Sequence, residues 1–159
     1  MQELCETRMT ARIHSLWLMP APSDEALLAG IVSELSGRFG TPLFAPHLTL
    51  QGDTETTPAV LERAVTTVAD TVEAVSERVT AVEGIESYFR SFYARFAASA
   101  PLTTLKRTLD PEDSTPFMPH VSLLYGAVEP SAKAAAITEI GARLAGRTIR
   151  FDRIGIVTS

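Results

Sequence analysis

The spacing of hydrophobic and polar positions predicts an alternation of strands and helices along the chain. A strand is expected over residues 12–19, where apolar side chains dominate up to a proline. Ser23 is the expected N-cap of a first helix, whose apolar residues recur at helical spacing until Gly40 ends it. A short second strand is expected from His47 to Gln51.

The remainder of the chain predicts three further helices and four further strands. Proline suits the first position of a helix, so Thr57-Pro58 is expected to begin the second helix. In the last strand the alternation of apolar and polar residues shifts by one position between Phe151 and Ile154. This shift indicates a β-bulge near Asp152. The remaining expected elements are strands over 77–83, 91–97, 120–125 and 148–157, a short helix from Pro101, a loop over 110–116, and a helix over about 131–144.

The order of these elements repeats within the chain. Each half contains a strand, a helix, a strand that begins with histidine, a further helix and a further strand. The two halves share little sequence identity, so the repeat is one of architecture. This interleaving favours two similar lobes that face one another.

Composition narrows the class of protein. A chain of 159 residues, 45% of them hydrophobic, suits one compact domain or two small lobes. No apolar run reaches the roughly 20 residues that span a bilayer, and the first ten residues hold no apolar block typical of a secretory signal. We therefore expect a cytoplasmic protein. The single Cys5 excludes an internal disulfide and a cysteine-based zinc site.

The net charge of -5 argues against a protein that coats nucleic acid through bulk electrostatics. It leaves room for a nucleotide-sized ligand held by a few groups. The acidic loop from Asp110 to Asp113 is either a lid over a site or a surface turn. Four basic residues near the middle of the chain are expected to form a solvated face rather than the border of a phosphate site: Arg90, Arg95, Lys106 and Arg107.

Two pentapeptides carry the candidate chemistry, and both follow the pattern Pro-His-aliphatic-hydroxyl-Leu. They are Pro46-His47-Leu48-Thr49-Leu50 and Pro119-His120-Val121-Ser122-Leu123. Residues i and i+2 of a strand point to the same face, so each histidine is expected to lie beside the hydroxyl of its own motif. The third histidine, His14, has no such context and is expected to be structural.

Paired histidines and hydroxyls suit one type of reaction. An imidazole titrates near neutral pH, so one of His47 and His120 can accept a proton while the other donates one. Hydroxyl groups can donate hydrogen bonds to the oxygens of a phosphate. The two motifs therefore predict attack of water on a strained cyclic phosphodiester, with no metal required.

The motif pair resembles the signature of the 2H phosphoesterase superfamily, in which two His-x-Thr/Ser-x motifs build one active site. The early Ser-Leu-Trp-Leu-Met-Pro segment and the stretch Pro-His-Val-Ser-Leu-Leu-Tyr-Gly are similar to the cyclic phosphodiesterase branch. The resemblance covers nearly the whole chain. It implies that residues 1–159 form a single bilobal α+β domain, in which two pseudo-symmetric antiparallel sheets with flanking helices line an active-site cleft between the lobes.

The resemblance also implies roles for individual residues. Strict alternation places Tyr125 on the opposite face from His120, so its role requires the strand to bend or end before Gly126. Trp17 is either a substrate contact or a core aromatic residue. The residues that match the superfamily pattern are His47 and His120 as the catalytic pair, Thr49 and Ser122 as phosphate-binding hydroxyls, and Tyr125 and Trp17 as substrate contacts.

The implied activity is cofactor-free hydrolysis of a nucleotide 2',3'-cyclic phosphate or of ADP-ribose 1'',2''-cyclic phosphate to a phosphomonoester. No membrane and no obligatory protein partner are expected. One alternative is an enzyme that acts on RNA ends, similar to 2'-5' RNA ligases, although the net charge of -5 does not indicate a basic groove. Another is a non-catalytic nucleotide-binding module, against which the retention of both histidines argues.

Overall fold

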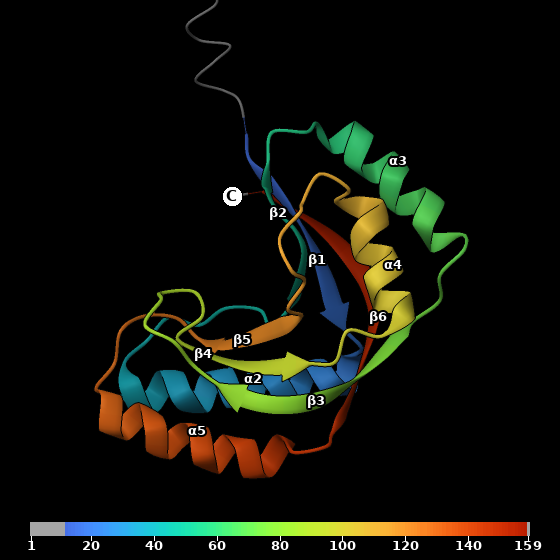
Figure 1. Ribbon diagram of the computed structural model, residues 1–159. Coiled ribbons are helices and arrows are strands. Elements are labelled where there is room, and N and C mark those ends of the chain that lie inside the picture. Colours follow the sequence, from blue (N-terminus) through green and yellow to red (C-terminus); the bar gives the residue numbers. More distant parts are fainter. Residues whose placement is uncertain (1–11, 159) are drawn as a thin grey trace, which may run out of the picture.

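The computed structural model describes residues 12–158, which fold into four helices and six strands (Figure 1). The strands are β1 (His14–Pro20), β2 (Leu48–Thr54), β3 (Val75–Glu83), β4 (Phe92–Phe96), β5 (His120–Leu124) and β6 (Thr148–Thr158). The helices are α2 (Pro22–Phe39), α3 (Pro58–Ala69), α4 (Ala100–Leu109) and α5 (Pro130–Leu144). The expected order of elements is confirmed.

The start of α2 corrects the expected helix cap. Ala21 is the N-cap of α2 and Pro22 lies in its first turn, so Ser23 is inside the helix and does not cap it. Proline forces the preceding residue into an extended conformation, and its own fixed φ suits the first helical position. The other end agrees with expectation, because Gly40 closes the helix with a φ of 69°, a left-handed conformation that glycine adopts without strain.

All neighbouring strands pair antiparallel, in the closed order β1-β2-β5-β4-β3-β6. Strand β6 pairs with both β1 and β3, so that Phe151 lies opposite Pro20 on one side and opposite Val75 on the other. The ring closes at the pair Leu48 and Val121, between β2 and β5. The α+β class with antiparallel strands is thus confirmed. The six strands form one closed sheet and not the two separate sheets that were expected, because the three-strand sets β2-β1-β6 and β3-β4-β5 are joined by the pairs β6–β3 and β2–β5. The bilobal arrangement stays a prediction.

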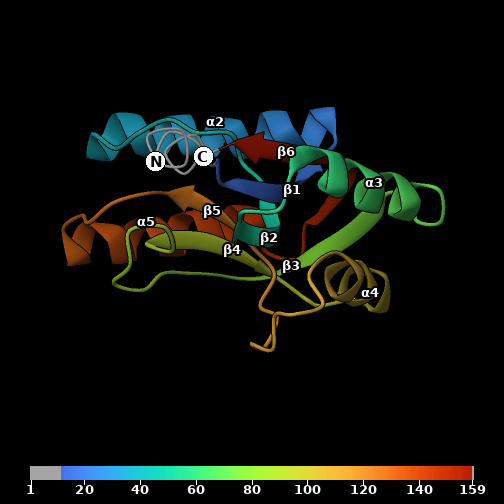
Figure 2. The same cartoon turned by 90° about the horizontal axis from the view of Figure 1, so that it is seen from above.

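Each strand set is covered by helices from both halves of the chain. Helices α3 and α4 contact each other and pack on β6 and β2, respectively, whereas α5 packs on β3 and β4, and α2 packs on β5 and β1 (Figures 1 and 2). Each half of the chain also gives its last strand to the other set, since β3 joins β4 and β6 joins β1. Each strand set therefore contains elements from both halves.

The bulge expected near Asp152 is confirmed. Met19 lies opposite Arg153 and Pro20 lies opposite Phe151, which leaves Asp152 as the extra residue of β6. The bulge lies next to the point where β6 passes from β1 to β3. There the fully buried ring of Phe151 contacts Phe96 edge to face, with a centroid distance of 5.7 Å.

No helix within residues 12–158 combines the length and the apolar character needed to cross a membrane. The cytoplasmic location stays a prediction. Cys5 and the first ten residues, to which the expected absence of a secretory signal refers, lie outside the described residues.

Candidate active site

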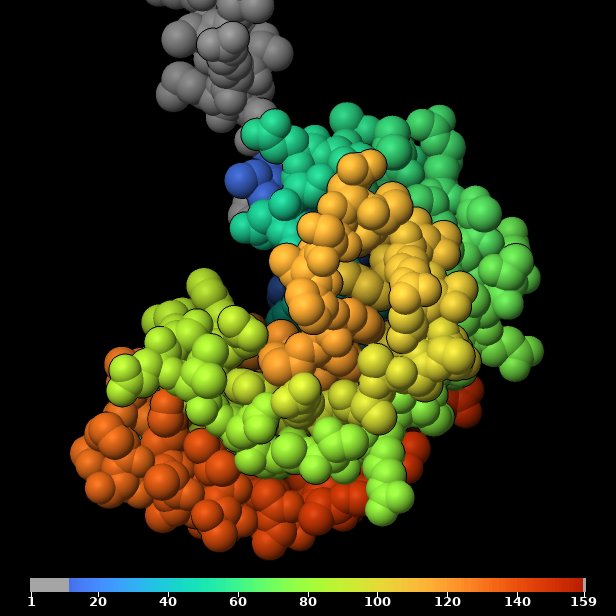
Figure 3. All heavy atoms as spheres, in the orientation of Figure 1, coloured from blue at the N-terminus to red at the C-terminus, as the bar shows by residue number. Residues whose placement is uncertain are grey.

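The two histidine motifs, 73 residues apart in sequence, meet at one pocket of about 520 Å³. All six residues predicted to form the site border this pocket. Its lining consists of Ser15, Trp17, His47, Thr49, Gly52, Asp53, Phe89, Arg90, His120, Ser122 and Tyr125. Figure 3 shows the surface hollowed on the side where the teal residues around β2 approach the yellow-green residues before β4.

Each histidine is oriented by the turn that precedes its strand. Nδ1 of His47 lies 2.8 Å from the carbonyl oxygen of Ala45, and Nδ1 of His120 lies 2.9 Å from that of Met118. A carbonyl oxygen only accepts hydrogen bonds, so Nδ1 carries the proton in both rings. In the neutral imidazole, Nε2 is then left as the acceptor. The two motifs therefore hold their histidines in the same tautomer.

Burial lowers the pKa of both imidazoles. For His47 the loss of hydration is the largest cause, opposed by the bond to Ala45 and reinforced by the charge of His120. For His120 the loss of hydration is again the largest cause, opposed by the bond to Met118 and reinforced by the charge of Arg90. In the free protein at pH 7, both rings are therefore mainly neutral.

An aromatic ring from the neighbouring strand packs against each histidine. The indole of Trp17 on β1 stacks on His47, with a centroid distance of 3.4 Å and an interplanar angle of 6°. The ring of Tyr93 on β4 meets His120 at 5.3 Å and 64°. Trp17 is therefore a wall of the pocket and is not a core aromatic residue. Sequence reasoning missed Tyr93, which is buried beside His120 and lies outside the lining of the pocket.

The predicted role of Tyr125 requires strand β5 to bend or end before Gly126, and it does. Strand β5 ends at Leu124, and Gly126 has a φ of 115°, so the alternation of faces stops before Tyr125. Its ring turns to the pocket and stacks on Phe44, with a centroid distance of 3.7 Å. Phe89 approaches the same ring edge-on at 5.2 Å. One side of the pocket thus carries a group of aromatic rings.

The two motif hydroxyls differ in their surroundings. Thr49 is exposed, and its hydroxyl has no hydrogen-bond partner among residues 12–158. Ser122 is only 9% exposed, and its hydroxyl donates to the carbonyl oxygen of Phe89 at 2.5 Å. The pseudo-symmetry of the site is therefore broken at this position.

Several lining residues escaped the sequence reasoning. Ser15 lies two residues before Trp17, on the same face of β1, and donates to Asp53 at 3.1 Å. Arg90 is exposed, as expected for a solvated face, but it also borders the pocket. Alternation along β1 could have identified Ser15, whereas the position of Arg90 depends on how the segment between β3 and β4 folds back.

The other candidates lie away from the pocket. Arg95 pairs with Glu83 at 3.3 Å. Lys106 binds the carboxylates of both Asp110 and Asp113, at 2.8 and 3.0 Å, which ties the acidic loop to α4. His14 is buried outside the pocket lining. Within residues 12–158, no three His, Cys, Asp or Glu side chains lie together as a group that could hold a metal ion.

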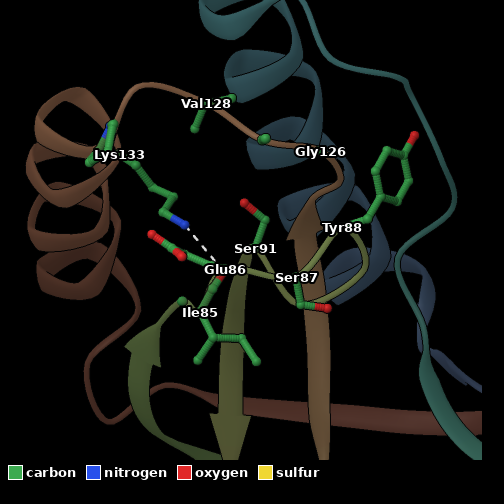
Figure 4. Close-up of a pocket in the computed structure, with 11 residues that line it drawn as sticks. Ile85, Glu86, Ser87, Tyr88, Ser91, Gly126, Val128 and Lys133 are labelled. Atoms are coloured by element: carbon green, nitrogen blue, oxygen red, sulfur yellow. Dashed lines mark hydrogen bonds between the residues drawn. The ribbon is translucent and has the colours of Figure 1, made fainter.

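A second cavity of about 530 Å³ is lined by Tyr88 and Ser91, the residues that flank Phe89 and Arg90 in sequence. Figure 4 shows its lining, with Lys133 on the left, Tyr88 on the right and Ser91 between them. It contains no histidine. The chemistry expected from the sequence therefore belongs to the pocket between the two motifs.

Comparisons with known proteins agree with the sequence motifs. The model of the cyclic phosphodiesterase-like protein family matches residues 12–148. A curated cyclic phosphodiesterase of Arabidopsis thaliana is 22% identical over 151 residues, which cover 91% of this chain and 83% of that protein. The crystal structure of E. coli LigT complexed with 3'-AMP has a similar fold, with a TM-score of 0.54 and 17% identity over 94% of this chain and 88% of that chain. A phosphoesterase crystal structure also has a TM-score of 0.54, with 16% identity, covering 93% and 88%.

Proposed function

This chain belongs to the cyclic phosphodiesterase-like protein family and is a phosphodiesterase of the hydrolase class, and we propose that it hydrolyses a small cyclic phosphate to a phosphomonoester. The proposed substrates are a nucleoside 2',3'-cyclic phosphate or ADP-ribose 1'',2''-cyclic phosphate. One observation carries the proposal. His47 and His120 each use Nδ1 on a backbone carbonyl and border the same pocket, which leaves both Nε2 atoms for the substrate.

In the proposed reaction the two histidines perform opposite proton transfers. Nε2 of the neutral imidazole accepts a proton from water as the water oxygen bonds to phosphorus. Nε2 of the other, protonated imidazole donates its proton to the ribose oxygen as the bond from phosphorus to that oxygen breaks. The negative charge of the bound phosphate favours protonation of one of the two rings. The hydroxyl of Thr49 donates to a non-bridging phosphate oxygen.

The pocket also suits the rest of a nucleotide. A volume of about 520 Å³ lies within the usual range for small-molecule sites. Tyr125 and Phe89 at its edge can stack on a flat base or pack against a ribose. The structurally similar LigT was crystallised with a nucleoside monophosphate, 3'-AMP, which supports a ligand of this size.

The proposed activity should persist in the presence of a chelator. Turnover of 2',3'-cyclic AMP is expected to be the same with and without EDTA, because the two imidazoles supply both proton transfers. The measurement is product formation by chromatography, with an enzyme-free reaction as the control. Loss of activity that one defined metal restores would contradict the metal-free mechanism.

The same assay separates the alternative functions. An oligoribonucleotide with a cyclic end that reacts much faster than the mononucleotide, by a factor that falls steeply with salt, would favour an enzyme for RNA ends. Binding of cyclic nucleotides without turnover would favour a nucleotide-binding module. We expect the mononucleotide to be the better substrate, since among residues 12–158 only Arg90 adds a Lys or Arg side chain to the pocket lining.

The plot of kcat/KM against pH is expected to be bell-shaped, with its maximum below pH 6.5. The profile of kcat/KM reports the pKa values of the free enzyme, with its maximum midway between them. Both histidine pKa values lie below their ordinary 6.5, so activity falls as the base protonates at low pH and as the acid deprotonates at higher pH. His14→Gln should leave the profile unchanged. A maximum above pH 7 would contradict this assignment.

A further inference from the structure

We infer that Lys106 is a positioning residue that connects the two histidine motifs. It holds the strand of the first motif next to Thr49 and, through the acidic loop, the segment that leads to His120. Lys106 lies on α4 and outside the lining of the pocket, so it acts on the substrate through other residues. The inference rests on the proposed function, because it concerns how the two motifs hold one phosphate group.

The strand of the first motif contains a β-bulge directly after Thr49. On β1, the neighbours Leu16 and Trp17 lie opposite Gln51 and Thr49. Leu50 is therefore the extra residue of β2, and the extra residue of a bulge is left out of the ladder of backbone hydrogen bonds. Leu50 is fully buried, so its carbonyl oxygen needs a hydrogen-bond donor from elsewhere in the protein.

Lys106 supplies this donor. Its ammonium group donates to the carbonyl oxygen of Leu50 at 2.7 Å, although the two residues are 56 positions apart in sequence. The side chain of Lys106 is only 12% exposed, and a hydrogen bond from a charged donor is stronger than one between neutral groups. Bulges beside active sites set the direction of neighbouring side chains. By fixing this bulge, Lys106 fixes the direction of the Thr49 hydroxyl.

The same ammonium group also holds the loop that leads to the second motif. It binds the carboxylates of Asp110 and Asp113 at 2.8 and 3.0 Å. It also lies 5.8 Å from the ring centroid of Phe117, three residues before His120. The other carboxylate oxygen of Asp113 accepts from the amide and the hydroxyl of Thr115, at 3.0 and 2.6 Å. One cation therefore contacts the strand of the first motif and the approach to the second.

Such a connection matters because the two motif strands pair over a short length. Within residues 12–158, β2 and β5 pair at Leu48 and Val121 alone. A phosphate that contacts both motifs requires their side chains at a fixed separation, and preorganisation of this kind increases affinity because less ordering is needed on binding. Lys106 adds a second connection between the motifs, on a side chain that does not touch the substrate.

A double-mutant cycle tests the inference through binding of 3'-AMP, measured by isothermal titration calorimetry. Lys106→Met is expected to raise the Kd about tenfold, the usual value of one hydrogen bond to a charged group, because the Thr49 hydroxyl loses its fixed direction. Adenosine has no phosphate, so its Kd should not change. In the Thr49→Ala background, Lys106→Met should raise the Kd for 3'-AMP by less than about twofold, since the positioned contact is already absent.

Three further variants complete the design, with circular dichroism of each to establish that the fold is retained. Arg107→Met removes an exposed cation from the next position of α4 and should leave the Kd for 3'-AMP unchanged. Asp110→Asn with Asp113→Asn cuts the connection to the loop and should raise this Kd, although the bond to the first motif remains. Adding Lys106→Met to that pair leaves no carboxylate without its cation, so this triple variant replaces Lys106→Met if the single variant does not fold.

Two outcomes would overturn the inference. One is a folded Lys106→Met variant, or the folded triple variant, whose Kd for 3'-AMP is within twofold of the wild-type value. The other is an equal loss of affinity for 3'-AMP and adenosine, which would make Lys106 a residue of general stability. A wild-type protein that binds 3'-AMP with the expected dependence on Lys106 but cleaves no cyclic phosphate would refute the proposed function and leave the positioning role standing.

Discussion

Replacing either His47 or His120 by alanine is expected to lower kcat/KM for 2',3'-cyclic AMP by about 10²–10⁴-fold, the usual contribution of a general acid or base. In the proposed mechanism each ring supplies one of the two proton transfers. The double variant should be little worse than either single one, because the pair acts as a unit. Initial rates at several substrate concentrations provide the measurement.

The third histidine provides the matched control. His14 is buried but does not line the pocket, so His14→Gln should keep the wild-type kcat/KM. Circular dichroism of all three variants establishes that the fold is retained. Near-complete activity in either motif variant would make that histidine structural and would remove the two-histidine mechanism.

Phe151→Ala is expected to destabilise the fold by about 3–5 kcal/mol, the usual range for a large aromatic residue removed from a core. Phe151 is fully buried and lies opposite strands on both of its sides, where β6 joins the two strand sets. Its loss therefore leaves a cavity at the junction and also removes the edge-to-face contact with Phe96. The free energy of unfolding in urea, extrapolated to water, measures the effect.

Leu43→Ala is the matched control for this stability measurement. Leu43 is an apolar side chain that is 70% exposed, so its removal should change the free energy of unfolding by less than about 0.5 kcal/mol. A loss below about 1 kcal/mol for Phe151→Ala would show that the junction collapses around the missing ring and does not depend on it.

The sequence predicted the elements well because their signals are local. Prolines mark the start of every helix, for example Pro58 in α3 and Pro130 in α5, and a phase slip located the bulge at Asp152. Strand pairing is different, because it depends on partners far away in sequence. Nothing within residues 148–158 indicates that one part of β6 pairs with β3 and the other with β1.

The site was predictable to the same extent. Alternation along a strand is a local rule, and it placed His47 beside Thr49 without knowledge of the fold. The partner of Ser122 could not be predicted, because the carbonyl of Phe89 lies 33 residues earlier in the chain. Arg90 reaches the pocket only because that segment folds back, so the sequence favoured a solvated face over the border of a phosphate site.

The exchange of last strands between the two halves means that neither half is a folding unit. A backbone break within residues 84–91 would produce one fragment with β1, β2 and β3 and another with β4, β5 and β6. Each fragment would carry one histidine motif, two strands of one set and the unpaired third strand of the other. Both sets, and the pocket between the motifs, would form only when the fragments associate, so the appearance of phosphodiesterase activity would report their reassembly.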